Sequence, residues 1–139
     1  MAQEKIHLTL FFVGSIERTR MTALERAASA ARARPFAMLI DRLGYWRHNQ
    51  IVWAGTTKCP AALVELAATL RVALAGEGVQ GEERPYAPHV TLVRNAGRKP
   101  APRPFEPCEW RVDEFVLVES VPAPGGVRYQ PRLRWPLGS

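Results

Sequence analysis

The chain has 139 residues, of which 47% are hydrophobic and 23% charged, a balance typical of one globular domain that can bury a core. This composition excludes a disordered chain, and no run of about eighteen apolar residues is present that could span a membrane. Lysine and arginine number 19 against 13 acidic residues, and the resulting formal charge of +6 permits an anionic partner such as nucleic acid without demonstrating one.

The first half of the chain predicts one helix among strands. Hydrophobic runs bounded by glycine or proline indicate a strand, a helix and two further strands, over residues 6–13, 22–34, 36–43 and 50–55. Thr22 is the expected N-cap of the helix, because Glu25 follows three residues later and completes a capping box. Pro35 is expected to end that helix.

The second half predicts a helix and then three strands, over residues 61–75, 88–94, 115–119 and 128–135. Pro60 opens the helix, and one face carries a leucine stripe made of Leu63, Leu66, Leu70 and Leu74. The proline-rich stretch 95–107 is expected to be a loop, and the last strand is expected to be weak. This order of elements indicates the α+β class.

A four-residue pattern occurs twice, each time on an expected strand. It is His7-Leu-Thr-Leu in the first strand and His89-Val-Thr-Leu in the second half, and together these use two of the three histidines. Because side chains alternate along a strand, each histidine shares a face with the threonine two residues on, while the apolar residues share the other face. Two related lobes would bring both imidazoles to one cleft.

A pair of histidines facing one bound group is suited to acid–base catalysis. One neutral ring can accept a proton while one protonated ring donates a proton, as cleavage of a phosphodiester requires. Thr9 and Thr91 can donate hydrogen bonds to phosphate oxygens, although threonine is also simply a good strand former. Singly, each histidine would be interpreted as an ordinary strand residue; the repeat favours catalysis.

Neither a metal nor a cofactor is expected. His48 is the only histidine left as a third zinc ligand, and no thiol or carboxylate accompanies either motif. The cysteines, Cys59 and Cys108, are isolated, which argues against a disulfide framework, and no secretory signal is visible, so a cytoplasmic location is expected. The sequence contains no glycine-rich phosphate loop, so it does not indicate binding of a nucleoside triphosphate.

The repeated motifs and their surroundings resemble the 2H phosphoesterase superfamily, in particular its RNA 2′,3′-cyclic phosphodiesterase and 2′-5′ RNA ligase group. The resemblance covers most of the chain and is carried by Lys5–Gly14, Leu43–Arg47, Ile51–Gly55 and Arg84–Arg94. It implies a bilobal domain with a pseudo-two-fold, in which two antiparallel sheets line a central cleft and the helices lie outside.

The same resemblance implies an activity and assigns roles. His7 would donate a proton to the leaving oxygen, His89 would activate water, and Thr9 and Thr91 would hold the phosphate. The substrate would be RNA with a 2′,3′-cyclic phosphate end, opened to a 2′-phosphate, and some members also join RNA ends through a 2′-5′ linkage.

Several further residues near the motifs are candidates for binding the substrate. Arg94 is odd-spaced from His89 on the strand but lies at its end, so a phosphate contact is a candidate role. Tyr86 is expected near the cleft, and Tyr86, Phe12 and Trp46 could stack nucleobases. Phe12 and Trp53 are more simply interpreted as core residues. The charges of the loop, Arg98, Lys99 and Arg103, either follow an RNA backbone or, more simply, are solvated.

Only six residues precede His7, whereas the family usually carries another strand and helix there. Residues 1–139 are therefore expected to form a single domain whose first lobe is truncated, either monomeric or dimeric through the exposed lobe edge. Two alternatives to the cyclic phosphodiesterase remain: a non-catalytic module that binds RNA or phosphate ends, and an esterase for another small cyclic phosphate.

Overall fold

The computed structural model describes residues 6–81, 85–101 and 105–138. Its elements, in chain order, are the 3-10 turn η2 (Arg18–Arg20), α1 (Met21–Ala30), β1 (Phe36–Ile40), β2 (Arg42–Trp46), β3 (Ile51–Gly55), α2 (Ala61–Gly76), β4 (Val90–Val93), β5 (Cys108–Val112), β6 (Glu114–Ala123) and β7 (Gly126–Pro136). In the described part of the chain, no helix is both long and apolar enough to cross a membrane.

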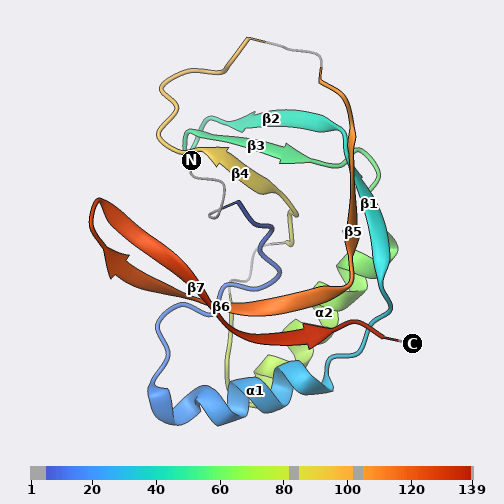
Figure 1. Cartoon of the computed structure of the whole chain (residues 1–139), viewed down its shortest axis with the longest axis vertical. Helices are drawn as coiled ribbons and strands as arrows, with labels where there is room; N and C mark the ends of the chain where they lie inside the picture. The colour runs from blue at the N-terminus through green and yellow to red at the C-terminus, as the bar shows by residue number, and fades with distance from the viewer. Residues whose placement is uncertain (1–5, 82–84, 102–104, 139) are drawn as a thin grey trace.

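The strands form antiparallel sheets, which confirms the α+β class. The described sheets are β1–β5, β2–β3–β4 and β6–β7, three where two were expected. Figure 1 shows β2–β3–β4 above and β6–β7 below, with β1 and β5 running between them along one side. The dark blue N-terminal segment, which carries the first motif, lies between the upper and lower sheets.

The expected strand 36–43 is wrong as a single strand, because Asp41 divides it into β1 and β2. The Asp41 N–H donates to the carbonyl of Gly55 at 3.0 Å. Its carboxylate accepts hydrogen bonds from the N–H and the hydroxyl of Thr57 at 2.7 and 3.0 Å. These contacts make a corner at which the chain leaves the β1–β5 sheet and enters the β2–β3–β4 sheet.

Both helices contribute to one hydrophobic core. Leu24 and Ala27 of α1 pack in a buried cluster with Leu66 and Leu70 of α2 and with Phe115 of β6. The leucine stripe expected on α2 is confirmed: Leu63, Leu66, Leu70 and Leu74 are all buried. The core therefore lies where α1, α2 and the β6–β7 sheet meet (Figure 1).

The capping box expected at Thr22 is wrong. Helix α1 begins at Met21, its N-cap is Arg20, and no side chain caps it. The 3-10 turn η2 leads directly into the helix, and its carbonyls accept hydrogen bonds from the first N–H groups, as in the bond from Met21 N to Arg18 O. These N–H groups therefore do not need a side-chain cap. The helix ends at Ala30 rather than Arg34, because the backbone turns to an extended conformation at Ala31.

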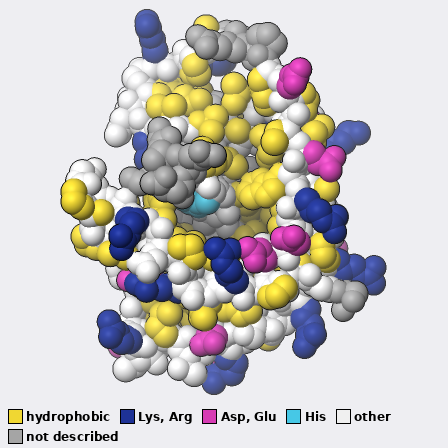
Figure 2. Space-filling view, viewed as in Figure 1, with side chains coloured by type: hydrophobic (Ala, Val, Ile, Leu, Met, Phe, Trp, Pro, Cys, Tyr) yellow, Lys and Arg dark blue, Asp and Glu magenta, His cyan; other side chains and the backbone are white. Residues whose placement is uncertain are grey.

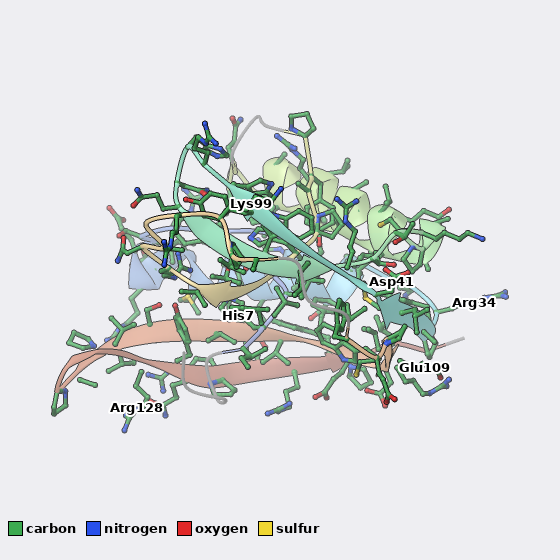
Figure 3. The ribbon with its side chains drawn as sticks, turned by 90° about the horizontal axis from the view of Figure 1, so that it is seen from above. His7, Arg34, Asp41, Lys99, Glu109 and Arg128 are labelled. Carbon is green, nitrogen blue, oxygen red and sulfur yellow. The ribbon has the colours of Figure 1, made fainter. Side chains whose placement is uncertain are left out.

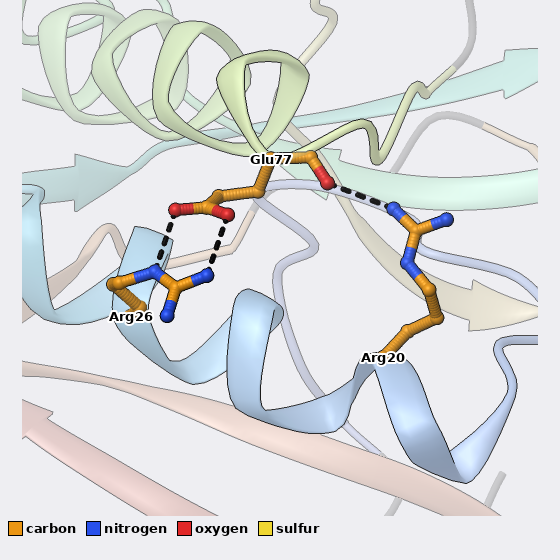
Figure 4. A network of polar contacts seen from close by, with 3 residues as sticks. All are labelled: Arg20, Arg26 and Glu77. Atoms are coloured by element: carbon orange, nitrogen blue, oxygen red, sulfur yellow. Dashed lines mark hydrogen bonds and ion pairs between the residues drawn. The ribbon is translucent and has the colours of Figure 1, made fainter.

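An arginine pair ties α1 and the turn before it to the end of α2 (Figure 4). The guanidinium of Arg26 donates two hydrogen bonds to the Glu77 carboxylate, at 2.7 and 2.9 Å, and Arg20 donates to the Glu77 carbonyl at 2.8 Å. The hydrogen bond from Arg26 lowers the pKa of Glu77. The ion pair between Arg26 and Glu77 is therefore fully formed at neutral pH, and its contribution to stability is lost as the Glu77 carboxyl becomes protonated in acid.

The expected strand over residues 6–13 is wrong, because the structure has only an isolated bridge in this segment. Leu8 forms an isolated antiparallel bridge with Val90. After this bridge the chain turns away, because Leu10, Phe11 and Val13 pack against the helical core instead of continuing a ladder. Phe12, which was expected in the core, is 67% exposed.

The C-terminal half contains more strand than the sequence predicts. Strand β5 was not expected; it pairs with β1 from Phe36–Val112 to Ile40–Cys108. The last strand, expected to be weak, pairs with β6 along its whole length, from Glu114–Pro136 to Ala123–Gly126. Two prolines are tolerated in β7 because it has a partner on one side only in the described sheet. Within the loop 95–107, residues 102–104 lie outside the described residues, and the described part contains no helix or strand.

Candidate active site

The two histidine motifs meet at their second residues. The antiparallel bridge between Leu8 and Val90 places His7 opposite Thr91 and Thr9 opposite His89. Because side chains alternate, these four residues project from one face while Leu8 and Val90 project from the other, where Val90 is 6% exposed. The structure thus brings together all four residues of the repeated pattern.

The arrangement puts the imidazoles at diagonal corners of a four-residue group. Across an antiparallel pair, directly opposite Cβ atoms lie about 4.5–5.5 Å apart and diagonal neighbours about 7–8 Å apart. Two rings at that separation can reach one small group from opposite sides, with the threonine hydroxyls at the remaining corners. In Figure 2 a histidine side chain, in cyan, lies within the central hollow, beside a hydrophobic wall.

His89 is held in a defined orientation and tautomer. Its Nδ1 atom lies 2.9 Å from the carbonyl oxygen of Ala87. A carbonyl can only accept a hydrogen bond, so Nδ1 carries the proton, and in the neutral ring the lone pair is on Nε2. The ring of Trp46 packs against the imidazole edge to face, with centroids 4.5 Å apart and planes at 72°. His89 is therefore arranged as a proton acceptor through Nε2.

His7 is packed against a residue from the far end of the chain. The ring of Tyr129 on β7 meets the imidazole at a centroid distance of 5.2 Å and an angle of 75°. Figure 3 shows His7 between the β2–β3–β4 sheet and the β6–β7 hairpin, so both parts of the fold contribute to its surroundings. Sequence reasoning missed Tyr129, because nothing in a strand expected to be weak indicates a contact over more than a hundred residues.

The two threonines have different environments. Thr91 is 8% exposed and is the cross-strand partner of Trp53 in the sheet. Thr9 is exposed, and its carbonyl accepts a hydrogen bond from the Tyr86 hydroxyl at 2.9 Å. Burial, with a smaller effect of nearby Cys59, raises the pKa of Tyr86, so the phenol stays protonated and remains a donor. Tyr86 therefore positions the first motif from the segment that precedes the second.

A layer of aromatic rings extends from His89 across the sheet. Trp46 lies 5.3 Å from Trp53, measured between ring centroids, and the guanidinium of Arg42 lies over the Trp53 ring at 5.1 Å. Gly44 makes room for this layer: a Cβ atom added there would lie 2.1 Å from the Trp53 ring. No pattern in the sequence indicated this role of Gly44.

Arg94 is not placed in the four-residue group. It follows the last residue of β4 and is exposed. The β3–β4 pairing has a register shift between Val52 and Trp53, so alternation counted from His89 does not assign Arg94 to a face. Among the described residues, no group of three or more His, Cys, Asp or Glu side chains is arranged to hold a metal ion. Cys59 and Cys108 are exposed thiols.

Comparison with known proteins gives consistent similarities. The family described as the 2′-5′ RNA ligase superfamily matches residues 1–122. The RNA 2′,3′-cyclic phosphodiesterase of Escherichia coli (strain K12) is 36% identical over 138 residues, which are 99% of this chain and 78% of that protein. The crystal structure of E. coli LigT with 3′-AMP superposes with a TM-score of 0.92 at 35% identity, covering 99% of this chain and 80% of that one. LigT crystallised with phosphate superposes with a TM-score of 0.86 at 32% identity, covering 100% of this chain and 79% of that one.

Proposed function

The chain belongs to the 2′-5′ RNA ligase superfamily, and from this premise we propose that it is an RNA 2′,3′-cyclic phosphodiesterase that uses His7 and His89 as its acid–base pair. The observation that carries the proposal is the bridge between Leu8 and Val90, which sets the two motifs face to face. The name of the E. coli relative and the 3′-AMP and phosphate bound to LigT support the substrate class.

The reaction needs one proton removed and one proton supplied. Nε2 of His89 accepts a proton from water as the water oxygen attacks phosphorus. The bond from phosphorus to O3′ breaks, and protonated His7 gives its proton to O3′, leaving a 2′-phosphate and a free 3′-hydroxyl. Hydrogen bonds from Thr9 and Thr91 to the non-bridging oxygens stabilise the charge that builds up at phosphorus. When the 5′-hydroxyl of a second RNA takes the place of water, the same steps give a 2′-5′ linkage.

The site is built by both parts of the fold, and we therefore treat residues 1–139 as one functional domain. His89 and Thr91 belong to the region of β4, whereas the partner ring of His7 comes from β7. Arg94 lies at the end of β4, where a longer substrate would contact it.

The direct test is an assay with a short RNA ending in a 2′,3′-cyclic phosphate, run with a chelator present. We expect a 2′-phosphate product and a bell-shaped dependence of kcat/KM on pH, because the acid and the base must be in opposite protonation states. Binding of RNA without turnover would contradict the proposal and indicate a binding module. Turnover of small cyclic nucleotides but not RNA would indicate a different esterase.

Tyr86→Phe is expected to lower kcat several-fold and to cost about 0.5–1.5 kcal/mol of stability, because the hydrogen bond that holds Thr9 is lost. Tyr45→Phe is the matched control: its hydroxyl also donates to a carbonyl, that of Ala96, at 2.9 Å, but away from the motifs. Denaturant unfolding and steady-state kinetics should show similar stability losses in both variants and a fall in kcat in Tyr86→Phe alone. An equal effect of both on kcat would remove Tyr86 from the positioning role.

A further inference from the structure

The positive charge of the chain is concentrated on one sheet and its loops. Residues 42–64 and 85–105 contain no aspartate or glutamate, and they include β2, β3 and β4. They carry seven of the 19 basic residues: Arg42, Arg47, Lys58, Arg94, Arg98, Lys99 and Arg103. The remaining residues have 12 basic against 13 acidic side chains, so the net charge of +6 arises from these two stretches.

Four of these cations are gathered at one end of the sheet. The turn between β2 and β3 is joined to the loop after β4 by a hydrogen bond from Ala96 N to Gln50 O at 2.8 Å. The Tyr45 hydroxyl donates to the Ala96 carbonyl at 2.9 Å. We call this region the basic end; its charged residues are Arg47, Arg94, Arg98 and Lys99, and all four are exposed. Among residues whose placement is described, none of the four forms an ion pair.

The basic end lies along the same strand as the candidate catalytic base. His89 immediately precedes β4, and Arg94 immediately follows it. A strand rises about 3.3 Å per residue, so about 13 Å separates His89 from Val93 at the end of β4. Stacked nucleotides advance about 3.4 Å each, so about four nucleotides would cover that distance. A strand of RNA with its cyclic end at the histidines is therefore long enough to reach the basic end.

We propose that the basic end binds the phosphodiester backbone of the RNA that precedes the cyclic phosphate. This rests on the proposed function and adds that the substrate is an oligonucleotide tail held by its phosphates. Guanidinium groups and a lysine ammonium are suited to phosphate oxygens, and neither stretch contains a carboxylate. The charge of this loop is thus a binding surface, where the simpler interpretation from sequence was solvated charge.

The test compares two double variants that make the same change in charge. Arg98→Glu with Lys99→Glu alters the basic end, and Arg32→Glu with Arg34→Glu alters an exposed stretch after α1. In Figure 3, Arg34 and Lys99 lie well apart. Each protein is assayed on a cyclic mononucleotide and on a ten-nucleotide RNA with a 2′,3′-cyclic end, over a series of salt concentrations.

For the RNA, the basic-end variant should lose about tenfold in kcat/KM at low salt, mostly through KM, because two phosphate contacts are removed. Its plot of log kcat/KM against log salt should be shallower by about 1.4, since each phosphate contact contributes about 0.7. Hydrolysis of the mononucleotide, and both activities of the control variant, should be unchanged. Equal losses of kcat/KM in the two double variants would overturn the proposal. A loss by the basic-end variant on the mononucleotide as large as its loss on the RNA would also overturn it.

Failure of the proposed function would be recognised separately. If the unaltered protein opens neither substrate, fluorescence anisotropy with the same labelled RNA measures binding directly. Weaker binding by the basic-end variant alone would then support the docking surface while contradicting the hydrolase. Identical RNA binding by the two variants would contradict the docking surface, whatever the activity.

Discussion

His89→Ala and His7→Ala are each expected to lower kcat on an RNA 2′,3′-cyclic phosphate by roughly 10²–10⁴-fold, the usual contribution of a positioned acid or base. KM should change little, because in the proposed mechanism the threonines still hold the phosphate. In that mechanism His89→Ala removes the proton acceptor, whose Nδ1 lies 2.9 Å from the Ala87 carbonyl, and His7→Ala removes the proton donor to O3′. Each single variant should also lose one limb of the bell-shaped pH profile.

The chain offers a matched control in its third histidine. His48 is exposed and its ring lies 6.2 Å from that of Trp46, which also contacts His89, yet His48 is outside the two motifs. His48→Ala should keep the activity of the unaltered protein. Full activity in either motif variant, with folding verified by circular dichroism, would rule out the paired mechanism.

Gly44→Ala is expected to destabilise the protein by about 1–3 kcal/mol, as overpacking of a well-filled site does. The added Cβ would lie 2.1 and 2.2 Å from two atoms of the Trp53 ring, so the indole has to move. Trp53 also contacts Trp46, which packs on His89, and the displacement should therefore reduce activity as well. Urea unfolding followed by tryptophan fluorescence measures the first effect.

Gly76→Ala is the corresponding control. It is the last residue of α2, and a Cβ there meets no other atom within 4 Å. Because alanine restricts the unfolded chain more than glycine, this variant should be unchanged or more stable by about 0.4–1 kcal/mol. If the Gly44→Ala protein were as stable as the Gly76→Ala protein, the Trp53 ring would have moved to accept the added Cβ atom without loss of stability.

Local sequence patterns predicted the elements that are determined by their own residues and depend little on contacts with distant segments. Helix α2 was expected within one residue of its observed end, because its period of leucines is a property of the segment itself. The division at Asp41 was not predictable, since it depends on hydrogen bonds with Gly55 and Thr57. The capping box at Thr22 failed for a related reason: the preceding 3-10 turn already supplies acceptors.

The candidate site shows the same limit. The repeat identified His7, Thr9, His89 and Thr91, because alternation on a strand assigns a face without knowledge of the fold. The contacts that orient these side chains come from distant segments, as with Tyr129 against His7, and sequence spacing carries no information about them. Tyr86 was expected near the cleft, but its hydrogen bond to the Thr9 carbonyl could not be predicted, because it joins residues 77 positions apart.

The joining of Leu8 to Val90 makes the site fragile in a particular way. This rung joins residues 82 positions apart and is accompanied by the hydrogen bond from the Tyr86 hydroxyl to the Thr9 carbonyl, whereas the β6–β7 hairpin is closed by a long ladder between neighbours in the chain. Contacts between distant segments form late in folding, and an isolated rung opens at a lower free energy than a long ladder. Local fluctuations can therefore separate the two imidazoles while the rest of the molecule stays folded, and catalytic competence is the first property that mild denaturation removes.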